Sequence, residues 1–392
     1  MRTFTIAERR HRLARRHFLS DAASGADEVT RMLVGLHGTD PATPYLSLWA
    51  RVPDFAVADL DTALYVDRNL LKHMAMRRTL WVVHTADLPA VQAAASDRVA
   101  DTERKKLIGS VEKAGIADDG AAWLDRATDA VRGHLAEGAF ANTAALRGSL
   151  PELAGDWDPA PGKTWGGSTP VAPRVLTVLS AQGHVLRGPN DGTWTTSRPR
   201  WASAAHWLPE PAPSLSADDA RAALLRAWLW TFGPATVTDV KWWFGQTLSW
   251  AREGLRAIEA VEVELEGSDD TGFVLPDDLE VDPAVAPWGA LLPSLDPTTM
   301  GWQARDWYLG PHAGRLFDRS GNAGPTLWWD GRVVGAWGQD ANSRVQLSYV
   351  DDVGASARKV LQRKASELTD WLAGVRIKPR FPSPLSTQLT PR

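Results

Sequence analysis

The sequence contains no cysteine, and this absence excludes disulfide bonds, cysteine nucleophiles and thiolate metal sites at once. It also lacks any apolar run approaching the roughly 18 residues needed to cross a bilayer, so we expect no membrane partner. The arginine-rich N-terminus has neither the apolar core nor the small-residue cleavage site of a secretory signal. These absences favour a soluble protein of the reducing cytoplasm.

Motifs for metal and phosphate binding are also missing. The nine histidines show no His-Glu-x-x-His motif and no close pair at helical metal spacing. Gly162-Lys163-Thr164 resembles the end of a phosphate-binding loop, but Gly155 lies too far upstream and no strand feeds the loop. We therefore expect neither a metal nor another cofactor.

The chain has no excess of positive charge. It contains 43 Lys and Arg residues and 47 Asp and Glu residues, so its formal net charge is −4. This balance argues against a protein that coats nucleic acid indiscriminately, but it allows one that concentrates its arginines on one face. Tryptophan is abundant, with 20 residues against 4 tyrosines. Core filling explains such rings most simply, and the alternative is that some form a stacking or cation–π platform.

The 392 residues are too many for one compact core, so we expect several domains. Three segments repeat one plan, in which helices are followed by a two-stranded hairpin, as in a winged helix. The sequence thus predicts an α+β fold with three tandem winged helix-turn-helix units and a small C-terminal region of β-sheet and helix. The predicted domains are residues 1–86, 87–208, 214–287 and 288–392.

Local signals place the elements within these units. Alternating apolar residues and turn signals predict hairpins over residues 71–84, 184–197 and 261–279. A helix is predicted over residues 26–38. Asp277-Asp278 is interpreted as solvated charge at a strand end. The proline-rich tail, residues 378–392, is expected to be an extended strap or a disordered end.

Chemistry concentrates in VGLHGTDPATPYLSLWAR, residues 34–51, where a helix is expected to end near Gly35. A neutral His37 can position a water molecule and accept its proton. Thr39 adds a second hydrogen-bonding group, and Asp40 adds negative charge or orients the ring. The alternative is that His37 and Thr39 merely cap the helix, while Asp40-Pro41 begins the next one.

Five stretches, spread in order over nearly the whole chain, carry a family pattern: GLHGTDPATPYLSLWARV, LWTFGPATVTDVKWWFG, TGFVLPDD, LLPSLDPTTMGW and WWDGRVVGAW. Together they resemble the tandem winged-helix DNA glycosylases of the AlkZ and YcaQ type. The resemblance implies a C-shaped scaffold of three winged helices around a basic, duplex-sized cleft. It also implies removal of alkylated purines, and in some members the unhooking of interstrand crosslinks.

Two positions depart from the family pattern. His37 stands where the relatives carry the first of two catalytic polar residues, a glutamine, and Thr39 stands where they carry the second, a glutamine or aspartate. In the first wing, where relatives tend to read Arg-Gly-Thr-x-His, residues 77–81 read Arg-Arg-Thr-Leu-Trp. The resemblance therefore supports two hypotheses. The first is a monofunctional DNA glycosylase acting on alkylated or bulky-adduct purines in DNA repair or genotoxin resistance. The second is a non-catalytic winged-helix DNA-binding protein, either a transcription factor or a lesion-binding shield.

The chemistry of an alkylated purine fits the first hypothesis. The base already carries positive charge, so its glycosidic bond needs little acid catalysis, and the enzyme must chiefly hold water against an oxocarbenium-like sugar. A protonated His37 would repel this substrate, so the hypothesis requires a neutral ring. Trp49 and Trp81 are the candidates for stacking on the lesion.

The expected partner is double-stranded DNA, bound by a monomer in the cytoplasm at the nucleoid. Arginines on the first two units are expected to neutralise phosphates along one concave face. The candidates are Arg9, Arg10, Arg77, Arg78, Arg187 and Arg198.

Overall fold

The computed structural model describes residues 1–158, 166–208 and 214–390, so Gly162-Lys163-Thr164 lies outside the described residues. The chain divides into two compact units. Unit 1 combines Met1–Leu60 with Arg221–Arg392, and unit 2 is Asp61–Ala220. The divisions fall within two helices, α4 (Val57–Tyr65) and α11 (Ala217–Phe232).

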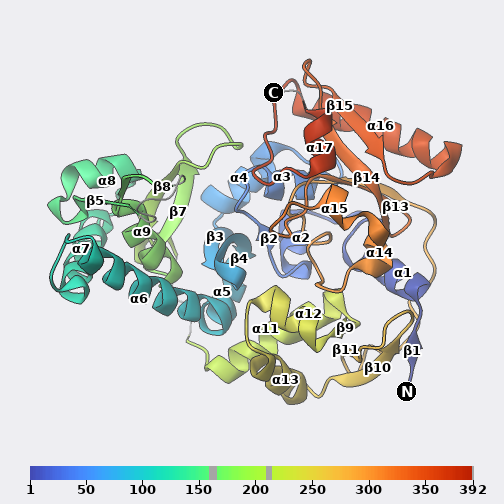
Figure 1. Ribbon diagram of the computed structural model, residues 1–392, viewed down its shortest axis with the longest axis horizontal. Coiled ribbons are helices and arrows are strands. Elements are labelled where there is room, and N and C mark those ends of the chain that lie inside the picture. The colour runs from blue at the N-terminus through green and yellow to red at the C-terminus, as the bar shows by residue number, and fades with distance from the viewer. Residues whose placement is uncertain (159–165, 209–213, 391–392) are drawn as a thin grey trace. The chain divides into compact units, whose positions relative to one another are not determined.

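Unit 1 is built from both ends of the chain (Figure 1). Its remaining elements, in chain order, are β1 (Thr3–Phe4), α1 (Ile6–Arg16), α2 (Ala26–Met32), β2 (Leu36–His37), α3 (Thr43–Trp49), β9 (Ala235–Thr236), α12 (Val237–Phe244), α13 (Leu248–Ala257), β10 (Val261–Leu265), β11 (Gly272–Val274), β12 (Gly289–Leu292), α14 (Asp306–Leu309), η5 (Gly310–His312), α15 (Ala313–Leu316), β13 (Thr326–Trp329), β14 (Arg332–Gln339), β15 (Val345–Tyr349), α16 (Gly354–Leu372) and α17 (Pro384–Leu389).

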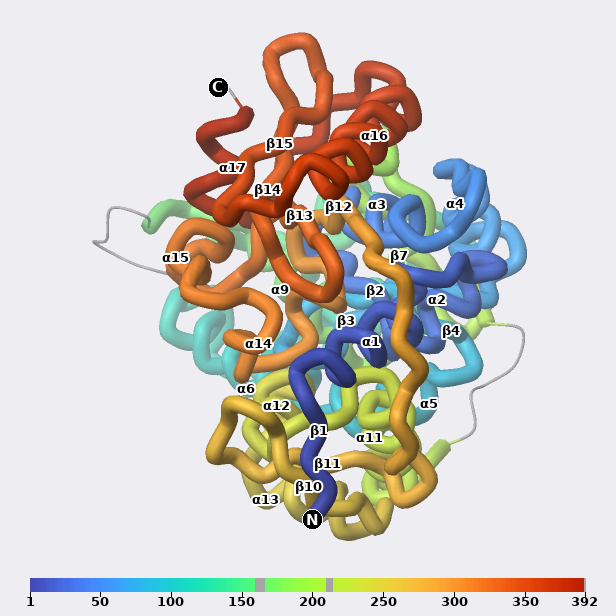
Figure 2. The backbone as a smooth tube through the Cα atoms, turned by 90° about the vertical axis from the view of Figure 1, so that its right-hand side faces the viewer, coloured from blue at the N-terminus to red at the C-terminus, as the bar shows by residue number. Residues whose placement is uncertain are grey.

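One sheet of unit 1 has the strand order β1-β10-β11-β9, and α12 packs against its strand β9 and against α13. The N-terminal strand β1 runs parallel to β10. Figure 2 labels both strands near the N-terminus. Helix α12 begins with a capping box, in which Thr236 and Asp239 satisfy each other's backbone N–H groups, and it ends at Gly245 with φ 65°. Trp228 of α11 and Trp243 of α12 are fully buried, and their ring centres lie 5.8 Å apart.

The second sheet of unit 1 is an antiparallel meander with the order β12-β13-β14-β15. Helix α16 packs against β12 and β15, and α17 packs against β14. The tail therefore contains a helix, which corrects the expectation of a strap or disordered end; Ser383 caps it, and Leu385 is buried. The predicted C-terminal region of sheet and helix is confirmed.

Unit 2 is mainly helical, and its described residues also form the antiparallel strand pairs β3–β4, β5–β6 and β7–β8. Its elements, in chain order, are β3 (Leu70–Ala75), η1 (Met76–Arg78), β4 (Thr79–His84), η2 (Thr85–Asp87), α5 (Leu88–Val91), η3 (Gln92–Ser96), α6 (Asp97–Lys113), α7 (Gly120–Leu135), α8 (Thr143–Ser149), η4 (Pro151–Leu153), β5 (Asp156–Trp157), β6 (Thr169–Pro170), α9 (Ala172–Ala181), β7 (Val185–Asn190), β8 (Pro199–Ser203) and α10 (Ala204–Trp207).

The core of unit 2 lies between α6, α7 and α9, where Leu124, Val131 and Leu179 have no exposed surface. The β3–β4 hairpin occurs where it was predicted. The next hairpin differs, because the partner of β7 begins at Pro199 rather than within residues 193–197, and the intervening residues form a longer turn. Alternating apolar residues predict the strands of both hairpins, but they do not predict the length of the turn between the strands.

The mixed α+β architecture is confirmed, and one helix boundary is corrected. The helix predicted over residues 26–38 ends at Met32, because Val34 (φ 55°) and Gly35 (φ 117°) adopt left-handed backbone conformations that no helix continues through. Residues 36–37 then form the short strand β2. None of the described helices is long and apolar enough to span a bilayer.

Candidate active site

His37 lies in β2, directly after the left-handed turn at Val34 and Gly35. Only 3% of its surface is exposed. The backbone N–H of Thr39 donates to Nδ1 of His37 at 3.4 Å, a long hydrogen bond. In a neutral ring, Nδ1 is then the acceptor and the proton lies on Nε2.

Asp40 is buried and stabilises the turn that leads into α3. Its Oδ1 accepts from the backbone N–H of Ala42 at 3.2 Å, and its Oδ2 accepts from the N–H of Arg380 at 2.9 Å. Burial raises the pKa of the Asp40 carboxyl above its usual value, and these hydrogen bonds together with the charge of Arg380 oppose the rise only in part. Asp40 is therefore a carboxylate whose proton affinity is increased, a common property of catalytic acids and bases.

The sequence did not indicate that the C-terminal tail lies beside this site. Besides its backbone bond to Asp40, Arg380 donates from Nη1 to the carbonyl oxygen of Thr39 at 3.5 Å. The two residues are separated by 341 positions, so no local signal could have paired them.

Helix α3 is fixed by a buried ion pair. Arg51 and Asp296 have no exposed side-chain surface, and their closest N···O distance is 2.7 Å. Burial raises the pKa of Asp296, but Arg51 and hydrogen bonds from Ser47 and Thr298 lower it by more, so it remains below its usual value. This interaction ties the helix that follows Asp40 to the conspicuous LLPSLDPTTMGW segment.

A small cavity of about 10 Å³ adjoins Asp40. This volume is close to the minimum for one water molecule and far below that of a purine base. Thr43 and Ser294 are among its lining residues, and Thr43 donates to the Ser294 carbonyl at 2.7 Å. The cavity is too small for a flipped base.

The candidate arginines of α1 contact protein groups. Arg9 is 5% exposed and its guanidinium lies 4.1 Å from the centre of the Trp307 ring. Burial lowers the pKa of Arg9 to about 10, which leaves it charged at neutral pH. Arg10 is partly exposed and donates to the carbonyl oxygen of Trp307 at 2.6 Å. Their role in binding DNA stays a prediction.

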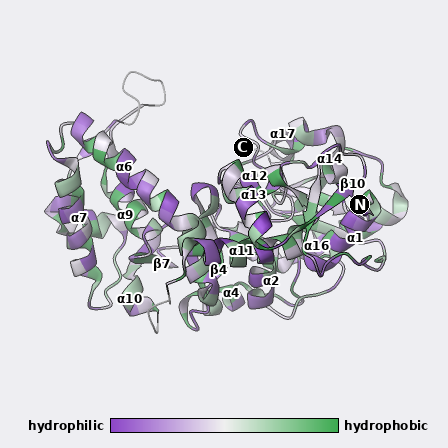
Figure 3. Ribbon diagram, turned by 90° about the horizontal axis from the view of Figure 1, so that it is seen from below, coloured by the Kyte–Doolittle hydropathy of each residue, from purple (hydrophilic) through white to green (hydrophobic). Residues whose placement is uncertain are grey.

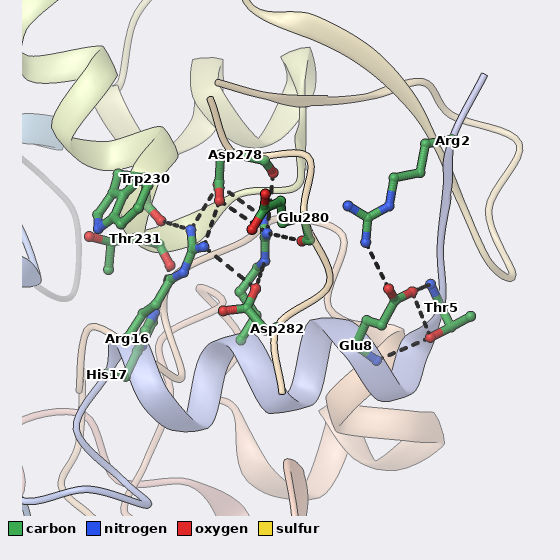
Figure 4. Close-up of polar contacts among 11 residues, drawn as sticks. Arg2, Thr5, Glu8, Arg16, His17, Trp230, Thr231, Asp278, Glu280 and Asp282 are labelled. Atoms are coloured by element: carbon green, nitrogen blue, oxygen red, sulfur yellow. Dashed lines mark hydrogen bonds and ion pairs between the residues drawn. The ribbon is translucent and has the colours of Figure 1, made fainter. Parts of the chain in front are cut away.

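Asp278 is buried, which corrects its interpretation as solvated charge. Figure 4 shows Arg16 directed at Asp278 from α1, and Arg12 pairs with the same carboxylate at 3.0 Å. Because Arg12 and Arg16 are four positions apart, both project from one face of the helix. Part of the N-terminal arginine cluster therefore stabilises the fold.

The candidate arginines of unit 2 differ in exposure. Arg77 and Arg78 form the tip of the β3–β4 hairpin, and Arg78 pairs with Glu103 at 2.7 Å. Arg187 is half-buried, 4.8 Å from the centre of the Trp201 ring. Arg198 is exposed in the turn between β7 and β8.

The two candidate stacking tryptophans lie in different environments. Trp49, at the end of α3, is partly exposed, and its ring centre is 6.4 Å from that of Trp371. Trp81 is 1% exposed, and its indole N–H donates to Thr79 Oγ1 at 2.8 Å. Stacking on a lesion stays a prediction for both, and Trp49 has the more accessible ring.

Across the described ranges, no group of three or more His, Asp or Glu side chains is arranged to hold a metal ion. The residues of the candidate site are thus a histidine, a threonine and a carboxylate, with one arginine of the tail beside them. Such a set can position water and accept a proton.

Comparison with known proteins gives a consistent result. The family model described as DNA glycosylase AlkZ-like matches residues 30–371. A curated relative, the interstrand DNA cross-link repair glycosylase of Streptomyces sahachiroi, is 32% identical over 174 residues, which cover 42% of this chain and 45% of the relative. The match thus spans less than half the length of that relative.

The solved structure of the DNA glycosylase AlkZ from Streptomyces sahachiroi covers the chain more fully. It aligns with a TM-score of 0.73 over 97% of this chain and 99% of that one, at 21% identity, which shows a shared fold. Because the family model spans most of the sequence, the chain belongs to the AlkZ-like DNA glycosylase family.

Proposed function

We propose that this chain is a monofunctional DNA glycosylase that hydrolyses the bond between deoxyribose and an alkylated or bulky-adduct purine. The observation that carries the proposal is the family match over residues 30–371. It is supported by His37 and Thr39, which stand where the family pattern places its polar pair, and by the buried Asp40 that follows them.

The reaction needs a water molecule and a leaving group that is already activated. Water attacks C1′ as the glycosidic C–N bond breaks, and the bonding electrons pass to the cationic purine, which leaves as a neutral base. The water proton must be accepted by a nearby group. As the glycosidic bond breaks, the sugar becomes oxocarbenium-like and gains positive charge. Neutral or negative groups near it are therefore favourable.

His37 fits the role of a neutral positioning group. With Nδ1 accepting from Thr39, the neutral ring is a hydrogen-bond donor through Nε2, as a glutamine amide would be. Asp40, whose pKa is raised by burial, is the proposed acceptor of the water proton. Hydrolysis by this set requires no lysine nucleophile and no lyase step.

The finer fold is part of the same proposal. We propose three tandem winged-helix units arranged as a C around duplex DNA. The clearest support is the order α11, β9, α12, α13, β10, β11, in which three helices precede a hairpin whose strand β11 also pairs with β9. The helices and hairpins of α7 to β8 follow a similar order.

The relative's name suggests a substrate larger than a methylated base. That relative is called an interstrand DNA cross-link repair glycosylase. We propose that bulky purine adducts, including those joined to the opposite strand, are substrates here as well.

The test is base release from a duplex with one N7-methylguanine. After incubation with the purified chain, hot alkali cleaves the strand at each abasic site, and free base is measured in the supernatant. We expect cleavage at the lesion and none in the undamaged duplex. Tight binding without any base release would instead support the non-catalytic DNA-binding protein.

A further inference from the structure

A groove of about 820 Å³ on unit 2 is not part of the candidate active site. It is formed by α6, the tip of the β3–β4 hairpin, β5 and the first turn of α9. Helices α6 and α9 pack against each other, and α6 is coloured largely hydrophilic in Figure 3. Five cations line the groove: Arg78, Lys105, Lys106, Lys113 and Arg174. This is a local positive excess in a chain of net charge −4.

A buried carboxylate fixes the positions of three of these cations. Glu103 is 4% exposed and pairs with Arg78 at 2.7 Å, Lys106 at 3.3 Å and Arg174 at 3.7 Å. Arg78 contacts both carboxylate oxygens, since its Nη2 also donates to Oε2 at 2.7 Å. Burial raises the pKa of Glu103, but hydrogen bonds and charge from Arg78 and Lys106 lower it by more, so it stays ionised at neutral pH.

The paired cations keep capacity for a further anion. The side chains of Arg78, Lys106 and Arg174 remain 46%, 64% and 42% exposed. A guanidinium has five N–H donors and an ammonium has three, so pairing with one carboxylate leaves donors for phosphate oxygens. Lys106 and Lys113 lie seven positions apart, on one face of α6, which extends the charge along the helix.

An aromatic ring lies among these charges. Trp157 lines the groove, is partly exposed, and has the guanidinium of Arg174 5.8 Å from its ring centre. Of the other two carboxylates of the groove, Asp156 pairs with Arg147 at 3.0 Å, so part of the negative charge is already neutralised. An indole face beside several cations is the combination that binds a nucleic acid strand, because bases stack on the ring while the phosphates are neutralised.

We propose that this groove binds the phosphates of one DNA strand, with a base stacked on Trp157. The inference rests on the proposed function for the identity of the partner as DNA. It assigns lysines of α6 and Arg174 to DNA binding, whereas the sequence pattern indicated only Arg78. An acidic peptide would satisfy the cations but would leave the ring without a stacking partner.

The test compares two double variants that each remove two exposed cations. Lys105→Ala/Lys106→Ala alters the groove, and Lys359→Ala/Arg363→Ala alters the exposed face of α16 as a control. Binding of an undamaged duplex is measured by fluorescence anisotropy over a range of salt concentrations. The groove variant should bind more weakly, and the slope of log K against log salt should become shallower by about 0.9 for each phosphate that is no longer neutralised. The control should keep the parent slope.

A third variant tests the ring. Trp157→Ala should weaken binding of single-stranded DNA by about fivefold or more, and binding of duplex by less. Polyglutamate of matched charge serves as the competing partner. Equal slopes for both double variants would overturn the proposal. So would an equal loss of duplex and single-strand binding by Trp157→Ala, or a groove variant that loses polyglutamate but keeps DNA.

These outcomes are separate from the fate of the proposed function. Binding is measured without base release, so the groove can be confirmed in a chain that releases no base. If the chain does release base, the groove variant should need more DNA to reach half of its maximal single-turnover rate, because its binding is weaker.

Discussion

His17 shows how one buried side chain makes stability depend on pH. It has no exposed surface, and burial together with the charge of Arg51 lowers its pKa to about 3. Its ring is held by Thr298 Oγ1 at 2.8 Å and by the carbonyl oxygen of Thr231 at 3.3 Å. Because the unfolded chain takes up a proton near pH 6.5 and the folded chain does not, stability is complete above that value and is lost as the pH falls toward 3.

We therefore expect the free energy of unfolding to fall between pH 7 and pH 5, with His17 contributing about 2 kcal/mol of the loss. His73, whose pKa burial lowers to about 4, should add a similar loss. Urea denaturation at pH 7 and pH 5 measures the loss of unfolding free energy, and this loss should be smaller in His17→Gln. His134→Ala, which removes an exposed histidine of α7, is the control. An unchanged pH dependence in His17→Gln would show that His17 is not kept neutral by the fold.

Trp49 and Trp81 can be separated by substitution. Trp49→Ala should weaken binding to alkylated duplex more than to intact duplex, since a cation–π contact with the charged base is worth about 0.5–2 kcal/mol. Trp81→Ala should instead lower stability by about 3–5 kcal/mol, because the ring is fully buried. Anisotropy titrations and urea denaturation distinguish the two. Equal loss on both duplexes for Trp49→Ala would assign that ring to packing.

At the scale of elements, the buried pair of Arg51 and Asp296 lies at the C-terminal end of α3. Asp296→Ala leaves the Arg51 charge buried without its partner, which should cost about 3–5 kcal/mol of stability. The exposed pair of Arg104 and Asp125 provides the comparison, because Asp125→Ala should cost less than about 1 kcal/mol. Urea denaturation measures both. Similar losses would mean that burial of the first pair has no energetic consequence.

Particular elements and residues show how much of the structure the sequence predicts. Alternating apolar residues predicted the β3–β4 hairpin, because it depends on neighbours within one element. The sequence also placed His37 and Asp40 together. It could not reveal the roles of Asp296 and Arg380, since both act on the site across more than 240 intervening residues. The prediction for Asp278 was wrong for the same reason, because its partners lie on α1.

For the whole molecule, electrostatics should control affinity for DNA. The net charge of −4 provides no general attraction, so binding must come from local groups of cations such as the groove on unit 2. We expect the association constant for duplex DNA to fall steeply as salt rises, with a slope set by the number of neutralised phosphates. Anisotropy titrations between about 50 and 200 mM salt measure the slope. An affinity independent of salt would contradict phosphate neutralisation as its source.

The central claim, that this chain is a glycosylase whose site contains His37, is tested most directly by single-turnover excision of N7-methylguanine from a duplex. The parent chain should release the base, His37→Gln should retain activity by keeping a neutral hydrogen-bonding group, and His37→Ala should be slower by roughly 10² or more. Thermal unfolding confirms that each variant is folded, and His134→Ala should match the parent. Excision by folded His37→Ala at the parent rate would contradict the account, because His37 would then only cap the turn after α2.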